Sequence, residues 1–378
     1  MLANGSCNLA SINLFAFVRN PFTEDAVFDY ERFIHVTEQM TWGLDELLTI
    51  LGDRHALPEQ KEHVKKWREV GLGIMGLADL ALAMNVSYGS REFVALIEAI
   101  MHTMANVSAQ ASARRAKELG VFPKYNYDYI SNSNYFNEVY TDKTKKMIKT
   151  HGLRNSRLLS IAPTGSISNV LGISGGVEPF YSLSYWRKVL YGDKNMIQVM
   201  ERTPQLLANH LGVETAEQLP EWAKVTSQNI NYKDRARVQS KIQKYVDTGV
   251  SSTFNLPNEA TIEDVMKIYE LSWIYGLKGA TVFRDNCAKI GILSGKEAWE
   301  VDSNPATPPI IEVVDEVTDL KTGEIKVSHY QVEVKAGGQV DTKKINVELC
   351  PECGSPMEKR DGCKHCSNDQ CFYQACSI

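Results

Sequence analysis

Six of the eight cysteines of this chain lie in its C-terminal stretch, from Cys350 onward. Four of them form two CxxC pairs with nine residues between the pairs: Cys350, Cys353, Cys363 and Cys366. Thiolates separated by two residues can bind the same tetrahedral Zn²⁺ ion, and Gly354 and Gly362 favour the tight turns that such pairs need. We therefore predict a zinc site formed by these four cysteines. The alternatives are metal-free thiols and, less favoured, His365 as a substitute ligand.

The last two cysteines, Cys371 and Cys376, are separated by four residues. A pair of accessible thiols on a mobile chain end is suited to thiol–disulfide exchange, because exchange needs an approachable thiolate. The alternative is that Cys371 completes the zinc site and Cys376 has no role. The spacing favours neither interpretation over the other.

A hydroxyl-rich turn follows a predicted apolar strand near the middle of the chain. It comprises Pro163, Thr164, Gly165, Ser166, Ile167 and Ser168. If a helix begins there, its first backbone N–H groups form a site for an anion such as phosphate. A strand-to-helix turn without a ligand is an equally good interpretation of these residues. A dinucleotide-binding fingerprint is matched formally at Gly71, Gly73 and Gly76, but we predict a helix there and reject the match.

Hydrophobic periodicity and helix-capping residues predict the elements that position these groups. Helices are predicted over 30–51, 61–84 and 90–119. Strands are predicted over 7–14, before Pro163, over 250–256 and over 278–283. Thr261 and Asp264 are close to a capping box at the start of a helix between the last two strands. Strand, helix and strand at this spacing predict a βαβ unit.

Composition and charge indicate an ordinary globular protein. The chain has 378 residues, 43% of them hydrophobic, and a net charge of -5. This length suggests one large domain or two to three smaller ones. The acidic balance argues against nucleic acid, and no apolar run approaches the length that spans a bilayer. The first residues lack the features of a signal peptide, so we predict a cytoplasmic protein without a membrane partner.

We predict three parts along the chain. Residues 1–300 form the globular body, 301–349 a linker and a β-hairpin segment, and 350–378 the cysteine-rich tail. The boundary is the proline-rich segment 303–309, which is typical of a linker. Residues 310–349 alternate Val and Ile with charged residues around a turn signal at 321–324. They are predicted to form a hairpin or to remain partly disordered.

Several segments together resemble the catalytic subunit of ribonucleotide reductase, specifically its adenosylcobalamin-dependent (class II) branch. They occur in the family's order: Ser6–Leu14, Gly71–Asp79, Ile161–Ser168, Gly176–Pro179, Ser251–Asn258, Gly276–Asp285 and the cysteine-rich end. The resemblance covers about the C-terminal half of the family's subunit. It implies an α/β fold, namely the second half of a ten-stranded α/β barrel, a linker and a zinc-ribbon-like tail. The implied activity is radical-based reduction of ribonucleotides to 2′-deoxyribonucleotides for DNA synthesis.

The resemblance also implies roles for single residues. Cys7 matches one member of the cysteine pair that supplies two electrons to the ribose. Cys371 and Cys376 match the C-terminal dithiol that reduces this pair and is itself reduced by thioredoxin or glutaredoxin. The turn of residues 163–168 matches the family's phosphate site for the ribonucleotide substrate. The family's Asn-x-Cys-x-Glu loop, whose cysteine carries the thiyl radical, has no counterpart in the 378 residues. The implied partner is therefore an N-terminal half of the reductase, and the chain resembles a split subunit or a fragment.

One strand indicates the branch of the family. Relatives that depend on iron or manganese carry a Tyr-Tyr pair after this strand, whereas the segment Lys278–Asp285 contains no tyrosine. The resemblance therefore implies that adenosylcobalamin is the radical source. The residues do not distinguish ribonucleoside diphosphates from triphosphates, and among relatives with this cysteine-rich tail diphosphates are the commoner substrates. The rival hypothesis is an inactive zinc-ribbon scaffold or binding protein derived from a half-barrel. A co-purifying chain that carries the missing loop would distinguish the two.

Overall fold

The computed structural model describes residues 4–6, 8–188 and 196–285, together with six strands beyond residue 310. Side chains are described for 4–6, 8–185 and 199–285. The chain divides into two compact units, Met1–Glu297 and Ala298–Ile378, which we describe separately. The predicted three-part division of the chain stays a prediction.

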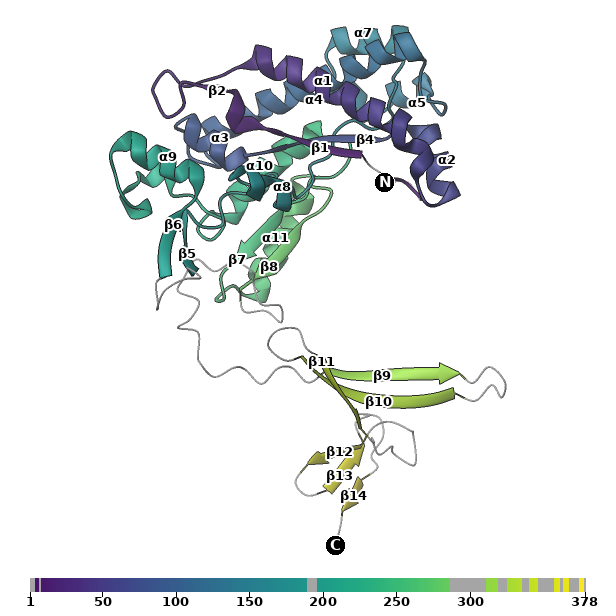
Figure 1. Cartoon of the computed structure of the whole chain (residues 1–378), viewed down its shortest axis with the longest axis vertical. Coiled ribbons are helices and arrows are strands. Elements are labelled where there is room, and N and C mark those ends of the chain that lie inside the picture. The colour runs from purple at the N-terminus through teal and green to yellow at the C-terminus, as the bar shows by residue number, and fades with distance from the viewer. Residues whose placement is uncertain are drawn as a thin grey trace. The chain divides into compact units, whose positions relative to one another are not determined.

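The first unit is built on parallel strands (Figure 1). Its strands are β1 (Asn8–Asn13), β2 (Val18–Arg19), β3 (Val27–Phe28), β4 (Val70–Met75), β5 (Ser184–Lys188), β6 (Met196–Met200), β7 (Thr253–Leu256) and β8 (Thr281–Arg284). β1 pairs with β4 and β7 pairs with β8, both in parallel, whereas β2–β3 and β5–β6 are antiparallel pairs.

An extended segment, residues 157–161, joins the two parallel pairs into one array. Leu72 of β4 forms a parallel bridge with Leu159, and Ile161 forms a parallel bridge with Val250, just before β7. Backbone hydrogen bonds from Leu72 N to Leu158 O (2.8 Å) and from Ile161 N to Gly249 O (3.0 Å) support this arrangement. Five extended segments therefore run in one direction, in the order β1, β4, 157–161, 248–256 and β8.

Eleven α-helices and four short 3-10 helices accompany this array within the described part of the chain. The 3-10 helices are Leu14–Phe17, Gly52–Arg54, Ala216–Gln218 and Glu221–Ala223. The α-helices are α1 (Tyr30–Leu51), α2 (Pro58–Trp67), α3 (Leu77–Ala83), α4 (Arg91–Leu119), α5 (Tyr127–Ser131), α6 (Asn134–Val139), α7 (Asp142–His151), α8 (Gly165–Leu171), α9 (Arg202–Leu211), α10 (Tyr232–Tyr245) and α11 (Ile262–Ile274). Ser90 caps α4 by accepting a hydrogen bond from Phe93 N, as the sequence predicts. Thr261 and Asp264 form the predicted capping box of α11, which completes the β7–α11–β8 unit.

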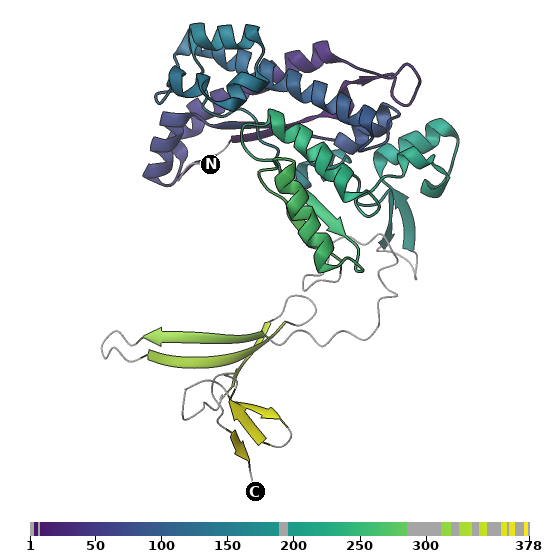
Figure 2. The same ribbon diagram turned by 180° about the vertical axis from the view of Figure 1, so that it is seen from behind.

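The helices cover the array because their apolar faces need burial. α1 packs on β1 and β4 and on α4, and α4 contacts α10, which in turn contacts α11 (Figure 2). A large core forms between these layers, with Leu72, Ile74 and Ile97 fully buried. A smaller core holds Phe254 and Leu256 of β7 against Ile268 of α11.

The predicted helix over 61–84 is wrong for its central part. Residues 61–67 belong to α2 and 77–83 to α3, but Val70–Met75 form β4, every residue of which is buried. A strand that is buried on both sides has no alternation of polar and apolar residues, so periodicity cannot separate it from a buried helix. Gly76, with φ of +72°, makes the sharp turn between β4 and α3. Gly71 and Gly73 lie inside the strand, not in the loop that a dinucleotide fingerprint requires.

The second unit is described by its strands. β9 (Ile311–Thr318), β10 (Ile325–Val334) and β11 (Val340–Ile345) form one antiparallel sheet, with β10 in the centre. β12 (Met357–Arg360), β13 (Cys363–Cys366) and β14 (Gln374–Cys376) form another, with β13 in the centre. The segment predicted to form a hairpin or to be partly disordered therefore contains three antiparallel strands.

Candidate functional site

The predicted phosphate turn lies where the central segment of the parallel array ends and α8 begins. Gly165, Ser166 and Ile167 form the first turn of α8 and are exposed. The first N–H groups of a helix have no partner inside the helix, so this turn is open to a ligand. In parallel α/β arrays, ligands bind beyond the carboxyl ends of the strands. The turn therefore occupies the end of the array where a ligand is expected.

Thr164 has an unusual backbone conformation at the start of this turn. Its φ of +55° lies in the left-handed region, which a β-branched residue rarely adopts. Such a residue costs of order 1–3 kcal/mol and persists where its surroundings hold it in place. Here the Gly176 N–H donates to Thr164 Oγ1 (2.8 Å), and the Ser168 N–H donates to the Thr164 carbonyl oxygen (2.9 Å). Both Thr164 and Ser168 are buried beneath the exposed first turn.

The loop of residues 172–178 packs directly against the backbone of the turn. A Cβ atom on Gly175 would lie 2.9 Å from the Pro163 carbonyl oxygen, so a larger residue does not fit there. Gly176 has a φ of +46°, and its Cβ would lie 3.0 Å from the Ala162 carbonyl oxygen. The two glycines thus allow the close approach that brings Gly176 N to Thr164 Oγ1. We call residues 172–178 the supporting loop.

A buried arginine holds one end of the supporting loop. Arg235 of α10 is 2% exposed. Its guanidinium donates to the Val177 carbonyl oxygen (2.6 Å), to Glu178 Oε2 (2.5 Å) and to Ser252 Oγ (2.7 Å). Tyr88 Oη donates to the same Val177 carbonyl oxygen (2.6 Å), and burial raises the pKa of Tyr88 to about 12. The Tyr88 hydroxyl is therefore protonated at neutral pH and available as a donor.

A buried aspartate holds the other end of the supporting loop. Asp79 of α3 is fully buried, and its Oδ2 accepts hydrogen bonds from Ser174 N (2.8 Å) and Ser174 Oγ (2.7 Å). Burial raises the pKa of Asp79 above its usual value, although the hydrogen bonds from the Ser174 N–H and hydroxyl groups oppose this shift. Burial, and then the charge of Asp79, raise the pKa of Glu201.

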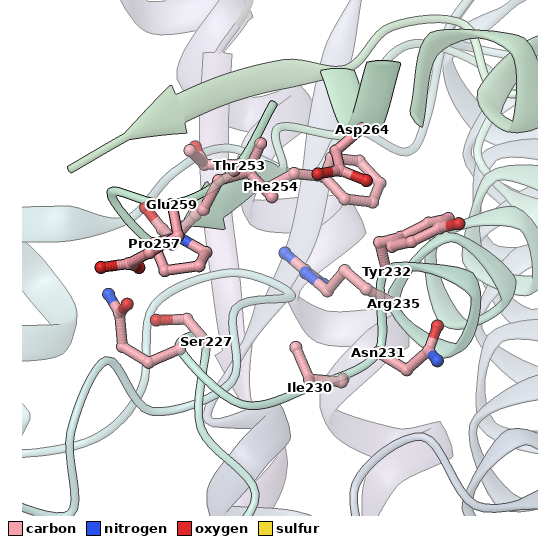
Figure 3. Close-up of a pocket in the computed structure, with 14 residues that line it drawn as sticks. Ser227, Ile230, Asn231, Tyr232, Arg235, Thr253, Phe254, Pro257, Glu259 and Asp264 are labelled. Carbon is pink, nitrogen blue, oxygen red and sulfur yellow. The ribbon is translucent and has the colours of Figure 1, made fainter. Parts of the chain in front are cut away.

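A cavity of about 310 Å³ borders Arg235 between the first turn of α10 and the end of β7 (Figure 3). Tyr232 and Arg235 line it from α10, and Phe254 and Pro257 line it from β7 and the residue after it. Figure 3 shows the Arg235 side chain extending from α10 toward the strand. Space for water therefore exists beside the guanidinium.

The predicted cysteine sites fall largely outside the described residues. Cys7, Cys350, Cys353 and Cys371 are not among them, and Cys363, Cys366 and Cys376 are described by their backbone alone. In the second unit, Cys363 of β13 lies opposite Cys376 of β14 in the register of the sheet. Among the described side chains, no group of three His, Cys, Asp or Glu residues could hold a metal ion. The zinc and dithiol assignments stay predictions.

Sequence analysis missed Arg235 and Asp79. Asp79 lies in a buried helix that follows the unrecognised strand β4. Arg235 is surrounded by charged residues in the sequence, but Val238, Gln239 and Ile242 follow it at helical spacing and are buried. This spacing places Arg235 on the buried face of α10 and could have indicated its burial.

These features define a mixed α/β protein with a parallel strand array and an accessible turn at its carboxyl end. Residues 2–283 match the family model described as ribonucleotide reductase, barrel domain. The chain therefore belongs to the ribonucleotide reductase barrel-domain family, as its resemblance implies. Within the described part of the chain, no helix has the length and apolar character needed to cross a membrane.

Two curated relatives are named vitamin B12-dependent ribonucleoside-diphosphate reductase. The protein of Mycobacterium tuberculosis is 29% identical over 332 residues, which are 83% of this chain and 43% of the relative. The protein of Thermoplasma acidophilum is 29% identical over 338 residues, which are 84% of this chain and 40% of the relative. The chain thus spans about two fifths of the length of these relatives.

A solved structure shares the fold. The alpha subunit of the Actinobacillus ureae class Id ribonucleotide reductase superposes with a TM-score of 0.55 and 22% sequence identity. The match covers 74% of this chain and 50% of that subunit. At this identity, the likeness shows a common fold.

Proposed function

We propose that the chain is the C-terminal part of a ribonucleotide reductase catalytic subunit and reduces ribonucleoside diphosphates together with an N-terminal part. The observation that carries this proposal is the accessible, conformationally strained turn at the carboxyl end of a parallel array in a chain of this family. The named activity of the two curated relatives supports the substrate class.

The five parallel segments are proposed to be half of a ten-stranded barrel. β1 and β8 stand at the two ends of the array, and each pairs with one neighbour within the described part of the chain. Unpaired strand edges expose backbone N–H and C=O groups that favour pairing with another chain. The N-terminal part of the reductase would pair with these edges and supply the loop with the radical cysteine.

The turn of residues 163–168 would bind the substrate phosphate. Backbone N–H groups of Gly165, Ser166 and Ile167 would donate to the phosphate oxygens, and the positive end of the α8 dipole would add to this attraction. The Ser166 hydroxyl is a further donor on the exposed side of the turn. The net charge of the chain is negative, so local N–H groups, not general charge, account for phosphate binding.

The cysteines would supply the electrons. Replacing the 2′-hydroxyl of the ribose by hydrogen takes two electrons and two protons and releases water. Cys7 and a cysteine of the N-terminal part would provide both, and their two sulfur atoms would become joined in a disulfide. The dithiol of Cys371 and Cys376 would then reduce this disulfide by exchange and become oxidised in turn. Thioredoxin or glutaredoxin would restore the dithiol.

Two bound groups belong to the proposal. Adenosylcobalamin would supply the radical, since β8 reads Thr-Val-Phe-Arg and contains no relay tyrosine. No residue of this chain is assigned to hold it.

A zinc ion would be held by Cys350, Cys353, Cys363 and Cys366. Metal analysis of the purified chain should find about one zinc per molecule, with loss in Cys353→Ser while the first unit stays folded. A chain that lacks bound metal but keeps an ordered tail would rule the zinc site out.

Reconstitution from two purified chains tests the proposed function. The isolated chain should reduce no ribonucleoside diphosphate, even with adenosylcobalamin and a dithiol, because the radical cysteine is not part of it. A mixture with an N-terminal part that carries the Asn-x-Cys-x-Glu loop should form a stable complex and become active when adenosylcobalamin is added. Activity of the isolated chain would contradict the split arrangement, and a requirement for an iron or manganese subunit would contradict the branch. An inactive but stable complex would favour the scaffold hypothesis.

A further inference from the structure

We infer that Arg235 is a positioning residue that holds the turn of residues 163–168 in its ligand-accepting conformation. The inference rests on the proposed function, in which this turn binds the substrate phosphate. Arg235 does not belong to the turn, and it acts through the supporting loop.

The guanidinium of Arg235 joins elements that are distant in the sequence. It contacts the supporting loop at Val177 and Glu178, and it contacts Ser252 immediately before β7. Glu178 extends this connection, because its Oε1 accepts a hydrogen bond from Thr253 N (2.8 Å) at the start of β7. The supporting loop is therefore fastened both to α10 and to a strand of the parallel array.

The supporting loop transmits this restraint to the turn. Val177 directly follows Gly176, whose N–H donates to Thr164 Oγ1, and the space between Gly175 and the Pro163 carbonyl oxygen is too small for a Cβ atom. Asp79 anchors the loop on its other side through Ser174. With both ends of the loop fixed, Gly176 stays at the position that keeps Thr164 in the left-handed region. If one end of the loop is released, Thr164 should leave the left-handed region, and the first turn of α8 should change its direction.

The chemistry of arginine explains why this residue type occupies the position. A guanidinium is planar and carries five N–H donors that point in several directions, so one group can bind a carbonyl, a carboxylate and a hydroxyl at once. A lysine ammonium is a compact charge on a flexible stem and lacks this fixed geometry. The neighbouring cavity leaves room for water, so a lysine can stay hydrated and the protein can stay folded.

A matched pair of variants tests the inference in the full-length chain. Arg235→Lys removes the proposed restraint, whereas Arg68→Lys alters a second buried arginine that bonds Asp45 Oδ1 (2.7 Å) and Thr49 Oγ1 (2.9 Å) of α1. Amide hydrogen exchange would be followed at Ser168 and Gly176, whose N–H groups both bond to Thr164. Binding of inorganic pyrophosphate would be measured by calorimetry on the same samples.

In Arg235→Lys we expect exchange at both amides to be at least about tenfold faster and the pyrophosphate dissociation constant at least about tenfold higher, because hydrogen bonds to a charged group are lost. In Arg68→Lys both quantities should stay within about twofold of the unsubstituted chain, even if the melting temperature falls equally. Equal exchange in the two variants would overturn the inference. Faster exchange with unchanged pyrophosphate affinity would overturn it as well.

Two further outcomes keep the test decisive. If the unsubstituted chain binds no pyrophosphate, the proposed phosphate site fails, while the exchange data still decide whether Arg235 restrains the turn.

If Arg235→Lys does not fold, Ser252→Ala replaces it, because this variant removes one neutral partner of the guanidinium and buries no unpaired charge. Exchange at Gly176 should then be at least about threefold faster, and an unchanged rate would overturn the inference.

Discussion

At the scale of single residues, two buried ionisable side chains, Arg235 and Asp79, hold the two ends of the supporting loop. Arg235 has a carboxylate partner in Glu178, so its charge is compensated inside the protein. Asp79 has no cationic partner among the described residues and relies on the Ser174 N–H and hydroxyl groups. A buried carboxylate without a counter-charge is costly in its ionised form. The two anchors of the supporting loop should therefore respond differently to pH.

Asp79→Asn should gain stability relative to the unsubstituted chain as the pH rises. The asparagine carbonyl can accept the two hydrogen bonds from Ser174 without a buried charge. Burial raises the folded-state pKa of Asp79 above 3.8, so the folded chain binds this proton more tightly than the unfolded chain. The stabilising contribution of the proton is complete below the unfolded pKa and is lost as pH rises through the folded pKa.

Urea unfolding of both proteins at about pH 4, near the unfolded pKa, and at about pH 8 measures this effect. Between these two pH values, the difference in unfolding free energy should move in favour of the Asp79→Asn variant. This difference should change by about 1.4 kcal/mol for each pKa unit by which the folded value exceeds the unfolded value, counting only the part of the shift that lies between the two pH values. A difference that stays constant between the two pH values would contradict the prediction.

At the scale of elements, the close packing of β4 depends on a glycine. A Cβ atom on Gly73 would lie 2.5 Å from the Ser160 carbonyl oxygen and 3.3 Å from Ser11 Oγ. Ser160 belongs to the neighbouring segment of the array, and its backbone is held by the hydrogen bond from Ser160 N to Leu72 O (3.1 Å). The backbone that a larger residue would meet is therefore part of the paired array and cannot move freely.

Gly73→Ala should destabilise the chain by about 1–3 kcal/mol, because a methyl group has no space between the two paired segments. Gly43→Ala is the matched control, since Gly43 lies in α1 and its Cβ would have no neighbour within 4 Å. That control should stabilise the chain by up to about 1 kcal/mol through the higher helix propensity of alanine. Urea unfolding of both variants measures whether the two changes in unfolding free energy have opposite signs. No destabilisation by Gly73→Ala would show that the strand packing is looser than described, and destabilisation by Gly43→Ala would contradict the open space beside Gly43.

At the scale of the whole molecule, the proposed dithiol relay uses cysteines from both ends of the chain. In the reconstituted enzyme, Cys371→Ser or Cys376→Ser should abolish turnover with thioredoxin but spare a single turnover, because Cys7 and its partner remain reduced at the start. Cys7→Ser should block both, since the cysteine pair that reduces the ribose is lost. Product formed with excess enzyme measures the single turnover, and product formed with excess substrate measures repeated turnover with thioredoxin. Full activity of the tail variants with thioredoxin would refute the relay.

The amino-acid sequence by itself determined the elements whose signals are local. The start of α4 at Ser90 and the capping box of Thr261 and Asp264 follow from side chains that bond to backbone groups a few residues away. The turn after the predicted strand was recognised from Pro163 and Gly165, whose backbone dihedral preferences are also local. The family was recognised because short motifs occur in a fixed order along the chain.

Tertiary structure alone decided the features that depend on distant neighbours. Val70–Met75 form a strand because β1 and the segment 157–161 supply hydrogen-bond partners on both sides, although the local pattern favours a helix. Thr164 lies in the left-handed region, and its hydroxyl accepts a hydrogen bond from Gly176 N, a residue that is distant from it along the chain. Arg235 is buried because Glu178, Val177 and Ser252 converge on it from separate parts of the chain. Local patterns encode short-range hydrogen bonds and amphipathic faces, whereas these conformations arise from contacts between residues that only the fold brings together.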